Sequence, residues 1–92
     1  MKKFVVAENF QKFKYFLENF AIEKVSQYGF VANENWRGIS PDTMFILFDD
    51  YQKNVEWRKG HLPIFLSRCS NVYIVQQVKY FDYVSLVEEW WK

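Results

Sequence analysis

The sequence has few of the residue types on which metal and nucleophile chemistry depend. Its 92 residues include one cysteine, Cys69, and one histidine, His61. A lone cysteine excludes an intrachain disulfide, and one His with one Cys is too few for a His/Cys zinc site. No GxSxG, P-loop or HExxH spacing occurs. We therefore expect a cytoplasmic protein with no disulfide framework, no metal or other cofactor, and no enzyme activity.

The chain also lacks long apolar runs and a strong net charge. No stretch approaches the roughly 20 apolar residues that a membrane-spanning helix needs. The basic start of the chain reaches Glu8 and Asn9 before the core of a signal peptide develops. Twelve basic and eleven acidic residues give a formal net charge of +1. These patterns argue against a membrane partner, and the total charge favours no particular ligand.

Aromatic residues, in contrast, are abundant. The chain has 10 Phe, 6 Tyr and 4 Trp, which make up 22% of its residues. A chain of this length forms one domain, over residues 1–92, and buries only about 60 to 65% of the surface of its unfolded state. Some rings should therefore remain at the surface, where aromatic side chains commonly anchor binding partners.

The hydrophobic pattern predicts an α+β fold with a small, antiparallel-rich sheet of about three to four strands. Apolar residues at helical spacing predict an N-terminal helix over residues 10–28, with Asn9 as its N-cap and Gly29 as its C-cap. The same reasoning predicts a short C-terminal helix over residues 82–91. The predicted core consists of Phe13, Leu17, Phe20, Phe45, Leu47, Ile74, Leu86 and Trp90.

Four segments have strand patterns, and the remaining segments between them, apart from the predicted helix over residues 10–28 and one helical turn, are loops or turns. The continuous apolar run at residues 43–48 predicts a central strand, and the alternation at 55–58 predicts its hairpin partner, with residues 49–54 between them. The other predicted elements are strands at 4–6 and 71–80, a loop at 31–42 and a helical turn at 64–66 after Pro63.

Three small signals have both a structural and a chemical interpretation. Asp49 and Asp50 end an apolar run, as metal-binding carboxylates of a nuclease could, but a strand-ending turn explains them better. His61 follows Arg58 and Lys59 and could transfer protons in a small RNase, although a solvated loop histidine is the simpler interpretation. For Cys69 a buried structural thiol is favoured.

The third quarter of the chain is its basic part. Residues 52–80 hold five basic side chains and one acidic side chain, Glu56. Trp57, Arg58 and Lys59, with Tyr73 and Tyr80 on the next predicted strand, have the composition of a sheet that binds single-stranded nucleic acid. The alternative is an ordinary half-buried hairpin with Trp57 in the core.

Three tryptophans are candidate anchors for a partner. Trp36 lies in the long predicted loop beside Arg37, and we expect it to be exposed there, unless it folds back to cover the core. Trp57 stands in the basic segment, and Trp91 lies off the apolar stripe of the predicted terminal helix. Arg37 could add a charge-assisted contact to a carboxylate or a phosphate.

These observations lead to a hypothesis of a small non-catalytic module that binds a larger macromolecular partner and modulates or inhibits it. In size, aromatic excess and lack of a catalytic signature, the chain resembles small proteins of phages and mobile elements that inhibit host machinery. A protein partner is expected, and the alternative is a nucleic-acid-binding module that uses residues 53–80. The predicted partner-binding residues are Trp36, Arg37, Trp57, Arg58, Lys59 and Trp91.

Overall fold

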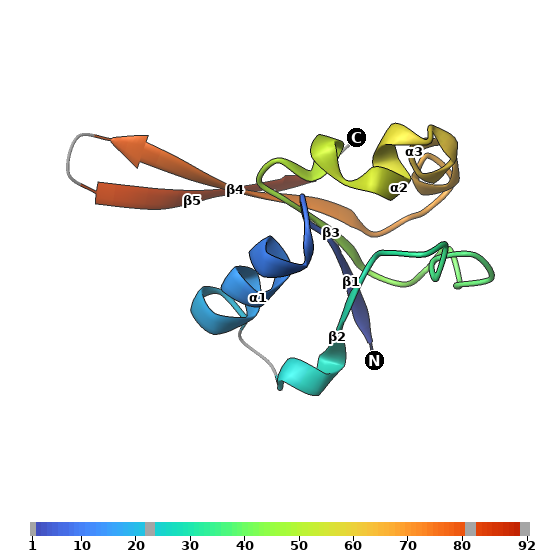
Figure 1. The fold of residues 1–92 in the computed structure, drawn as a ribbon, viewed down its shortest axis with the longest axis horizontal. Helices are drawn as coiled ribbons and strands as arrows, with labels where there is room; N and C mark the ends of the chain where they lie inside the picture. Colours follow the sequence, from blue (N-terminus) through green and yellow to red (C-terminus); the bar gives the residue numbers. More distant parts are fainter. Residues whose placement is uncertain (1, 22–23, 81–82, 91–92) are drawn as a thin grey trace.

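The computed structural model describes residues 2–21, 24–80 and 83–90, with side chains described up to residue 77 (Figure 1). Five strands form one sheet in the order β2-β1-β3-β4-β5. The first four strands in this order run parallel, and β5 pairs antiparallel with β4. The strands are β1 (Lys3–Val6), β2 (Tyr28–Phe30), β3 (Phe45–Phe48), β4 (Val72–Tyr80) and β5 (Tyr83–Trp90).

The expected mixture of helices and strands is present, but the expected antiparallel-rich sheet is wrong. Three of the four strand pairings are parallel, and each parallel connection needs a crossover rather than a tight turn. Residues 55–58, predicted to pair with β3 in a hairpin, instead form helix α2 (Val55–Arg58). Residues 83–90, predicted to be helical, form β5 because they complete the ladder with β4. Long-range pairing thus overrides the local helical pattern.

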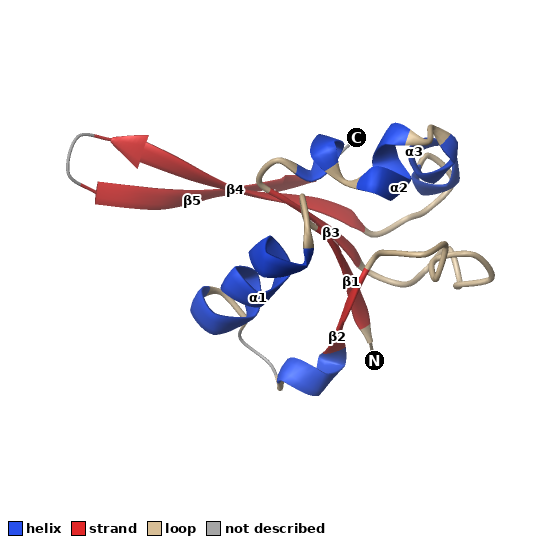
Figure 2. Cartoon of the chain, in the orientation of Figure 1, coloured by secondary structure: helices blue, strands red, loops and turns tan. Residues whose placement is uncertain are grey.

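Helices cover both faces of the sheet (Figure 2). Helix α1 (Phe10–Asn19) follows β1 and packs on one face, while α2 and α3 (His61–Leu66) lie between β3 and β4 and pack on the other. The β1–β2 and β3–β4 connections run in opposite directions across the sheet. Because connections between parallel strands share one handedness, the helices in these two connections lie on opposite faces. Two single-turn 3₁₀ helices are η1 (Val25–Gln27) and η2 (Tyr51–Lys53).

Helix α1 begins as predicted and ends early. The side chain of Asn9 accepts a hydrogen bond from the backbone N–H of Lys12 at 2.9 Å, which confirms the N-cap. The helix ends at Asn19 instead of residue 28, and Gly29 lies within β2. A Cβ atom at Gly29 would come within 3.0 Å of Lys2 Cε and 3.1 Å of Phe4 Cε1. A side chain at this position would press on the side chains of Lys2 and Phe4, so glycine favours close packing beside β1 and does not serve as a helix C-cap.

Alternate residues of the strands fill two cores instead of the single core that was predicted. All four residues of β3 are buried, which confirms it as a central strand: Phe45 and Leu47 pack toward α2 and α3, and Ile46 and Phe48 pack toward α1. Of the predicted core residues, Phe13, Phe45, Leu47 and Ile74 are buried, Leu17 and Phe20 are half-buried, and Leu86 and Trp90 lie outside the described side chains.

The strands predicted at residues 4–6 and 71–80 are confirmed as β1 and β4, and the helical turn at 64–66 is confirmed as part of α3. Strand β3 pairs with only the first four residues of β4, Val72–Val75. The remainder of β4 pairs with β5 as a two-stranded ribbon, which projects from the body of the molecule in Figure 1.

Candidate functional site

The parallel strands end at one edge of the sheet, and this edge carries the candidate site. Strand β1 lies between β2 and β3, and the chain leaves β1 and β3 toward opposite faces. In open α/β sheets, this reversal of strand order separates the loops at the carboxyl ends and leaves a crevice in which ligands bind. The segments after β1 and after β2 meet the start of α2 at this edge, and they line a pocket of about 300 Å³.

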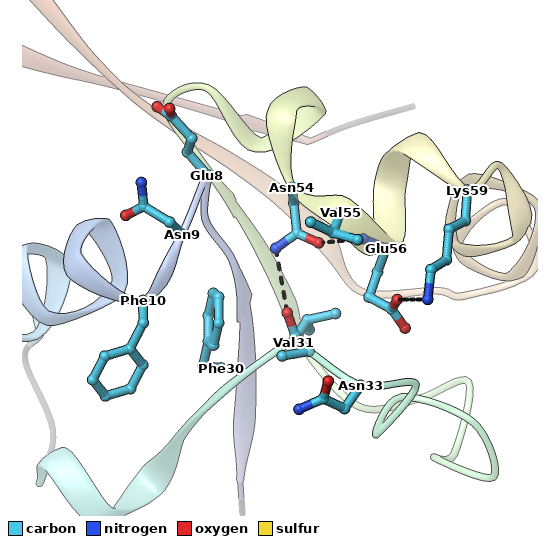
Figure 3. A pocket seen from close by; sticks show the side chains of 11 residues that line it. Glu8, Asn9, Phe10, Phe30, Val31, Asn33, Asn54, Val55, Glu56 and Lys59 are labelled. Atoms are coloured by element: carbon cyan, nitrogen blue, oxygen red, sulfur yellow. Dashed lines mark hydrogen bonds and ion pairs between the residues drawn. The ribbon is translucent and has the colours of Figure 1, made fainter.

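The pocket combines an apolar rim with a polar wall (Figure 3). Two rim side chains are large, apolar and exposed to solvent: Phe10 at 57% and Val55 at 65%. Phe30 lies beside Phe10, with the two ring centroids 5.8 Å apart in a T-shaped arrangement. The polar wall includes Asn54, Glu56 and Lys59. This combination, a small apolar hollow with a few fixed polar groups, is typical of binding sites.

The buried amide of Asn54 connects three segments of this edge. Its Nδ2 donates hydrogen bonds to the carbonyl oxygens of Ala7, after β1, at 2.7 Å, and of Val31, after β2, at 3.2 Å. Its Oδ1 accepts a hydrogen bond from the backbone N–H of Glu56 at 2.8 Å and thereby caps α2. One side chain therefore satisfies two buried carbonyl groups and holds α2 against the ends of two strands.

The carboxylate of Glu56 is 3% exposed and accepts three hydrogen bonds. Its Oε1 accepts from the backbone N–H of Glu34 at 2.6 Å and from Trp36 Nε1 at 2.9 Å, and its Oε2 contacts Lys59 Nζ at 3.1 Å. Burial alone raises the pKa of this carboxyl group, but the hydrogen bonds from Trp36, Lys59 and Glu34 and the charge of Lys59 outweigh it. The net pKa of Glu56 lies below its ordinary value of 4.5.

The lowered pKa of Glu56 predicts a loss of stability in acid. A carboxyl group with a lowered folded-state pKa stabilises the fold fully above its ordinary value, and this contribution is lost as the pH falls through the folded-state pKa. We expect Glu56→Gln to be less stable than the wild type at pH 7 and to lose less stability below pH 4.5. Urea unfolding over this pH range measures both effects, with Glu18→Gln on the exposed side of α1 as the matched control. If the free energy of unfolding depends on pH in the same way for the wild type and for Glu56→Gln, the lowered pKa of Glu56 is contradicted.

Two residues with strained backbone stand next to the pocket. Asn33, which lines the pocket, has a φ angle of 51°, and Glu34 has a φ angle of 58°. Left-handed conformations are unfavourable for residues other than glycine, more so for Glu than for Asn. Because the Glu34 N–H donates to Glu56, the buried carboxylate helps to hold this turn in place. Such strain persists only where the surroundings fix it, as they do at many functional sites.

The adjacent aspartates, Asp49 and Asp50, follow the carboxyl end of β3, and Asp49 has the structural role that was favoured. Asp49 has a φ angle of 46°, and its carboxylate accepts hydrogen bonds from the backbone N–H and from Nε2 of Gln77 at 2.7 and 2.8 Å. Tyr15 on α1 donates to Oε1 of the same glutamine at 3.0 Å. The Asp49 carboxylate thus ties β3 to β4, as expected for a strand-ending turn.

Trp36 is the main correction among the predicted site residues. We expected it to be exposed, but it is buried, with only 4% of its surface exposed. Its ring packs against Phe65 of α3 with centroids 5.2 Å apart. Its Nε1 donates to Glu56, so the indole has both an apolar and a polar partner within the fold. The alternative, that this loop tryptophan folds back onto the core, is confirmed. Arg37 is exposed and lies over the Trp36 ring at 4.8 Å.

The other predicted site residues fall into separate groups. Trp57 is half-buried and packs edge-on against Tyr51, with ring centroids 4.8 Å apart. Arg58 and Lys59 are exposed at the end of α2, and Lys59 lines the pocket. His61 is exposed at the start of α3, and Cys69 is buried, as favoured. Trp91 lies outside the described residues.

The basic and aromatic sheet predicted for residues 53–80 does not form. Trp57 and Arg58 lie on helix α2 and Lys59 is its C-cap, while Tyr73 lies on β4 and packs against the core under α1. The rings of Trp57 and Tyr73 therefore belong to opposite faces of the sheet and do not form one stacking platform. This arrangement removes the structural argument for the nucleic-acid hypothesis, although nucleic-acid binding itself stays untested.

Sequence reasoning identified only Lys59 among the residues that line the pocket, and it missed the place of Phe10, Asn54, Val55 and Glu56 in the site. Two signals were available. Asn54 precedes a short helix as an N-cap does, and Glu56 is the one acidic residue among five basic residues in 52–80. Phe10 and Val55 carry no comparable signal, because their exposure depends on how α1 and α2 meet the sheet.

Within the described residues, no helix has both the length and the apolar character that crossing a membrane requires. Comparisons of the chain with protein-family models, with curated proteins and with solved structures found no match.

Proposed function

We propose that this protein is a non-catalytic binding module that holds a partner protein at the pocket on the carboxyl edge of its sheet. One observation carries the proposal: Phe10 and Val55, two large apolar side chains more than half exposed, line the same preformed pocket. Apolar side chains around a hollow, next to fixed polar groups, are what a partner's anchoring side chain needs.

The clustering of exposed apolar side chains supports this proposal. Single exposed apolar residues are ordinary on protein surfaces, whereas a group of them around a hollow indicates contact with a partner. Phe10 begins α1 and Val55 begins α2, so the two come from helices on different faces of the sheet and line the same pocket at this edge. Burial of both on binding would contribute favourably through the hydrophobic effect.

The rigidity of the polar wall also supports the proposal. Asn54 and Glu56 are buried and bonded to the segments that follow β1 and β2. A site whose walls are fixed before binding loses less conformational entropy when the partner docks. The partner is therefore proposed to meet a preformed hollow, in which its side chain replaces water.

The chemistry of Glu56 favours binding over catalysis. A general base works best with a pKa near the operating pH, whereas the hydrogen bonds to this carboxylate hold its pKa below 4.5. We propose that the module modulates or inhibits its partner by occupying a surface, and that it does so in the cytoplasm, where the thiol of Cys69 would stay reduced.

Selection from a random-peptide display library on the immobilised protein tests the proposal. We expect Phe10→Ser to weaken the binding of selected peptides about tenfold or more, because an anchor contact is lost. The matched control is Ile64→Ser: Ile64 on α3 is 57% exposed, as is Phe10, and does not line the pocket. Thermal unfolding of both variants verifies that they fold. Equal weakening by the two variants would contradict the proposed location of the site.

A further inference from the structure

At the α2 end of the pocket, Lys59 has unused hydrogen-bond donors, whereas the acceptor oxygens of Glu56 are already occupied. Both oxygens of the Glu56 carboxylate are occupied, Oε1 by Glu34 and Trp36 and Oε2 by Lys59. The Lys59 side chain is about half exposed, and its ammonium group uses one of its three N–H donors on Glu56. The capacity that remains at this end of the pocket therefore suits a ligand that accepts hydrogen bonds.

The net charge around Lys59 is positive, which also suits a ligand that accepts hydrogen bonds. The buried carboxylate of Glu56 is neutralised by Lys59. The neighbouring Arg58 is exposed, and its guanidinium has no hydrogen bond or ion pair with any residue in the described part of the chain. Val55, Arg58 and Lys59 together line a second, shallow hollow that adjoins the first at Val55 and Lys59. Apolar and cationic groups are thus adjacent on α2.

Glu8, the other acidic residue of the pocket, does not offset this charge at the α2 end. It stands before α1, on the opposite side of the pocket from Lys59, and Figure 3 shows its carboxylate turned away from the Lys59 ammonium. A ligand that spans the pocket therefore meets apolar side chains from Phe10 to Val55 and then a positive end at Arg58 and Lys59.

We infer that the partner presents an apolar side chain flanked by an aspartate or glutamate, with the apolar group between Phe10 and Val55 and the carboxylate on Lys59 and Arg58. This inference rests on the proposed function and adds the chemistry of the partner to it. Charge-assisted bonds to a carboxylate are stronger than neutral ones and fix the orientation of the segment. Because Lys59 has spare donors, it can bind the partner's carboxylate without leaving Glu56.

Matched dipeptide probes test the inference in NMR titrations of the isotope-labelled protein. Acetyl-Phe-Glu-amide and acetyl-Phe-Gln-amide have nearly the same shape and differ in charge. We expect both to shift the backbone signals of Phe10, Val55 and Lys59, and the Glu probe to bind about three- to tenfold more tightly at low salt. Added salt should reduce this preference, because the contact is partly exposed.

Variants of the cationic end separate charge from structure. Lys59→Gln should remove most of the preference for the Glu probe, and Lys59→Arg should keep it. Because Lys59 also bonds to Glu56, Arg58→Gln provides a second variant that leaves the Glu56 network intact and should reduce the preference in part. Loss of the preference in Lys59→Gln, with Phe10 and Val55 still shifted by both probes, would support the inference.

Four results would overturn it. Equal binding of the Glu and Gln probes would contradict the claim that the partner presents a carboxylate, but it would not contradict the proposed pocket. Tighter binding of acetyl-Phe-Lys-amide would have the same meaning. Tighter binding of acetylphenylalanine than of the Glu probe would assign the site to a chain-terminal carboxylate instead. Absence of any shift at Phe10 and Val55 with every probe would reject the pocket itself, and with it the proposed function.

Discussion

Replacing Asn54 with alanine should lower the free energy of unfolding by about 2 to 4 kcal/mol. The substitution removes the cap of α2, which is commonly worth about 1 kcal/mol. It also leaves the carbonyl groups of Ala7 and Val31 without the donor that Nδ2 supplies, at about 1 to 3 kcal/mol for a buried group. Urea unfolding monitored by tryptophan fluorescence measures the change, with Gln52→Ala on the exposed side of η2 as the control.

A second variant separates the two roles of Asn54. Asn54→Asp keeps the oxygen that caps α2 but replaces the donor with an oxygen that faces two carbonyl groups. We expect Asn54→Asp to be at least as unstable as Asn54→Ala. If Asn54→Ala costs less than about 0.5 kcal/mol, the proposed connection between the strand ends and α2 is wrong.

Trp36→Ala should be the more damaging of the two main substitutions, with a loss of about 3 to 5 kcal/mol. A buried indole in contact with Phe65 would be replaced by a cavity, and Glu56 would lose one of its three donors. Domains of this size have a total stability of only about 5 to 14 kcal/mol. The variant should therefore be close to unfolding at physiological temperature.

Trp36→Phe distinguishes the ring from its hydrogen bond. Phenylalanine keeps most of the apolar contact with Phe65 but cannot donate to Glu56, so we expect a loss of about 1 to 3 kcal/mol. Calorimetric unfolding of both variants gives the comparison. If Trp36→Ala folds with nearly wild-type stability but fails to bind the partner, Trp36 is an anchor after all, as the sequence had suggested, and its assigned place in the core is wrong.

Local patterns predicted those elements whose signals lie within the elements themselves. The strand at Phe4–Val6, the central strand ending at Phe48 and the long strand β4 followed from apolar and β-branched residues. The start of α1 followed from Asn9, whose side chain caps the helix regardless of what packs against it. In these cases, local preference and tertiary structure agree.

The errors arise where distant partners decide the structure. Residues 55–58 alternate like a strand with Val55 and Trp57 inside, yet Asn54 caps a helix in which Val55 is exposed and Glu56 is buried. Glu56 is buried in place of Val55 because Glu34 and Trp36, about twenty residues earlier in the chain, donate hydrogen bonds to its carboxylate. Burial of a charge depends on such partners, and these cannot be read from a local pattern.

The parallel direction of the strands could not be predicted from local sequence patterns for a related reason. The helical pattern of residues 10–28 continues past Asn19, which concealed the return of the chain to β2 and hence the parallel pairing of β2 with β1. The predicted terminal helix concealed the ladder between β4 and β5 in the same way. As a consequence, the edge of the sheet that carries the pocket could not be located from the sequence.

Site-specific photo-crosslinking tests most directly the central claim that this pocket holds a protein partner. A photoreactive amino acid replaces Val55 at the rim or, as the matched control, Val25 on η1, which is 57% exposed and lies outside the pocket. Irradiation in the native cells, followed by mass spectrometry, identifies what each position touches. We predict a protein adduct from position 55 that is absent from position 25 and is lost with Phe10→Ser. Adducts from position 25 alone, or equal adducts from both positions, would contradict the account.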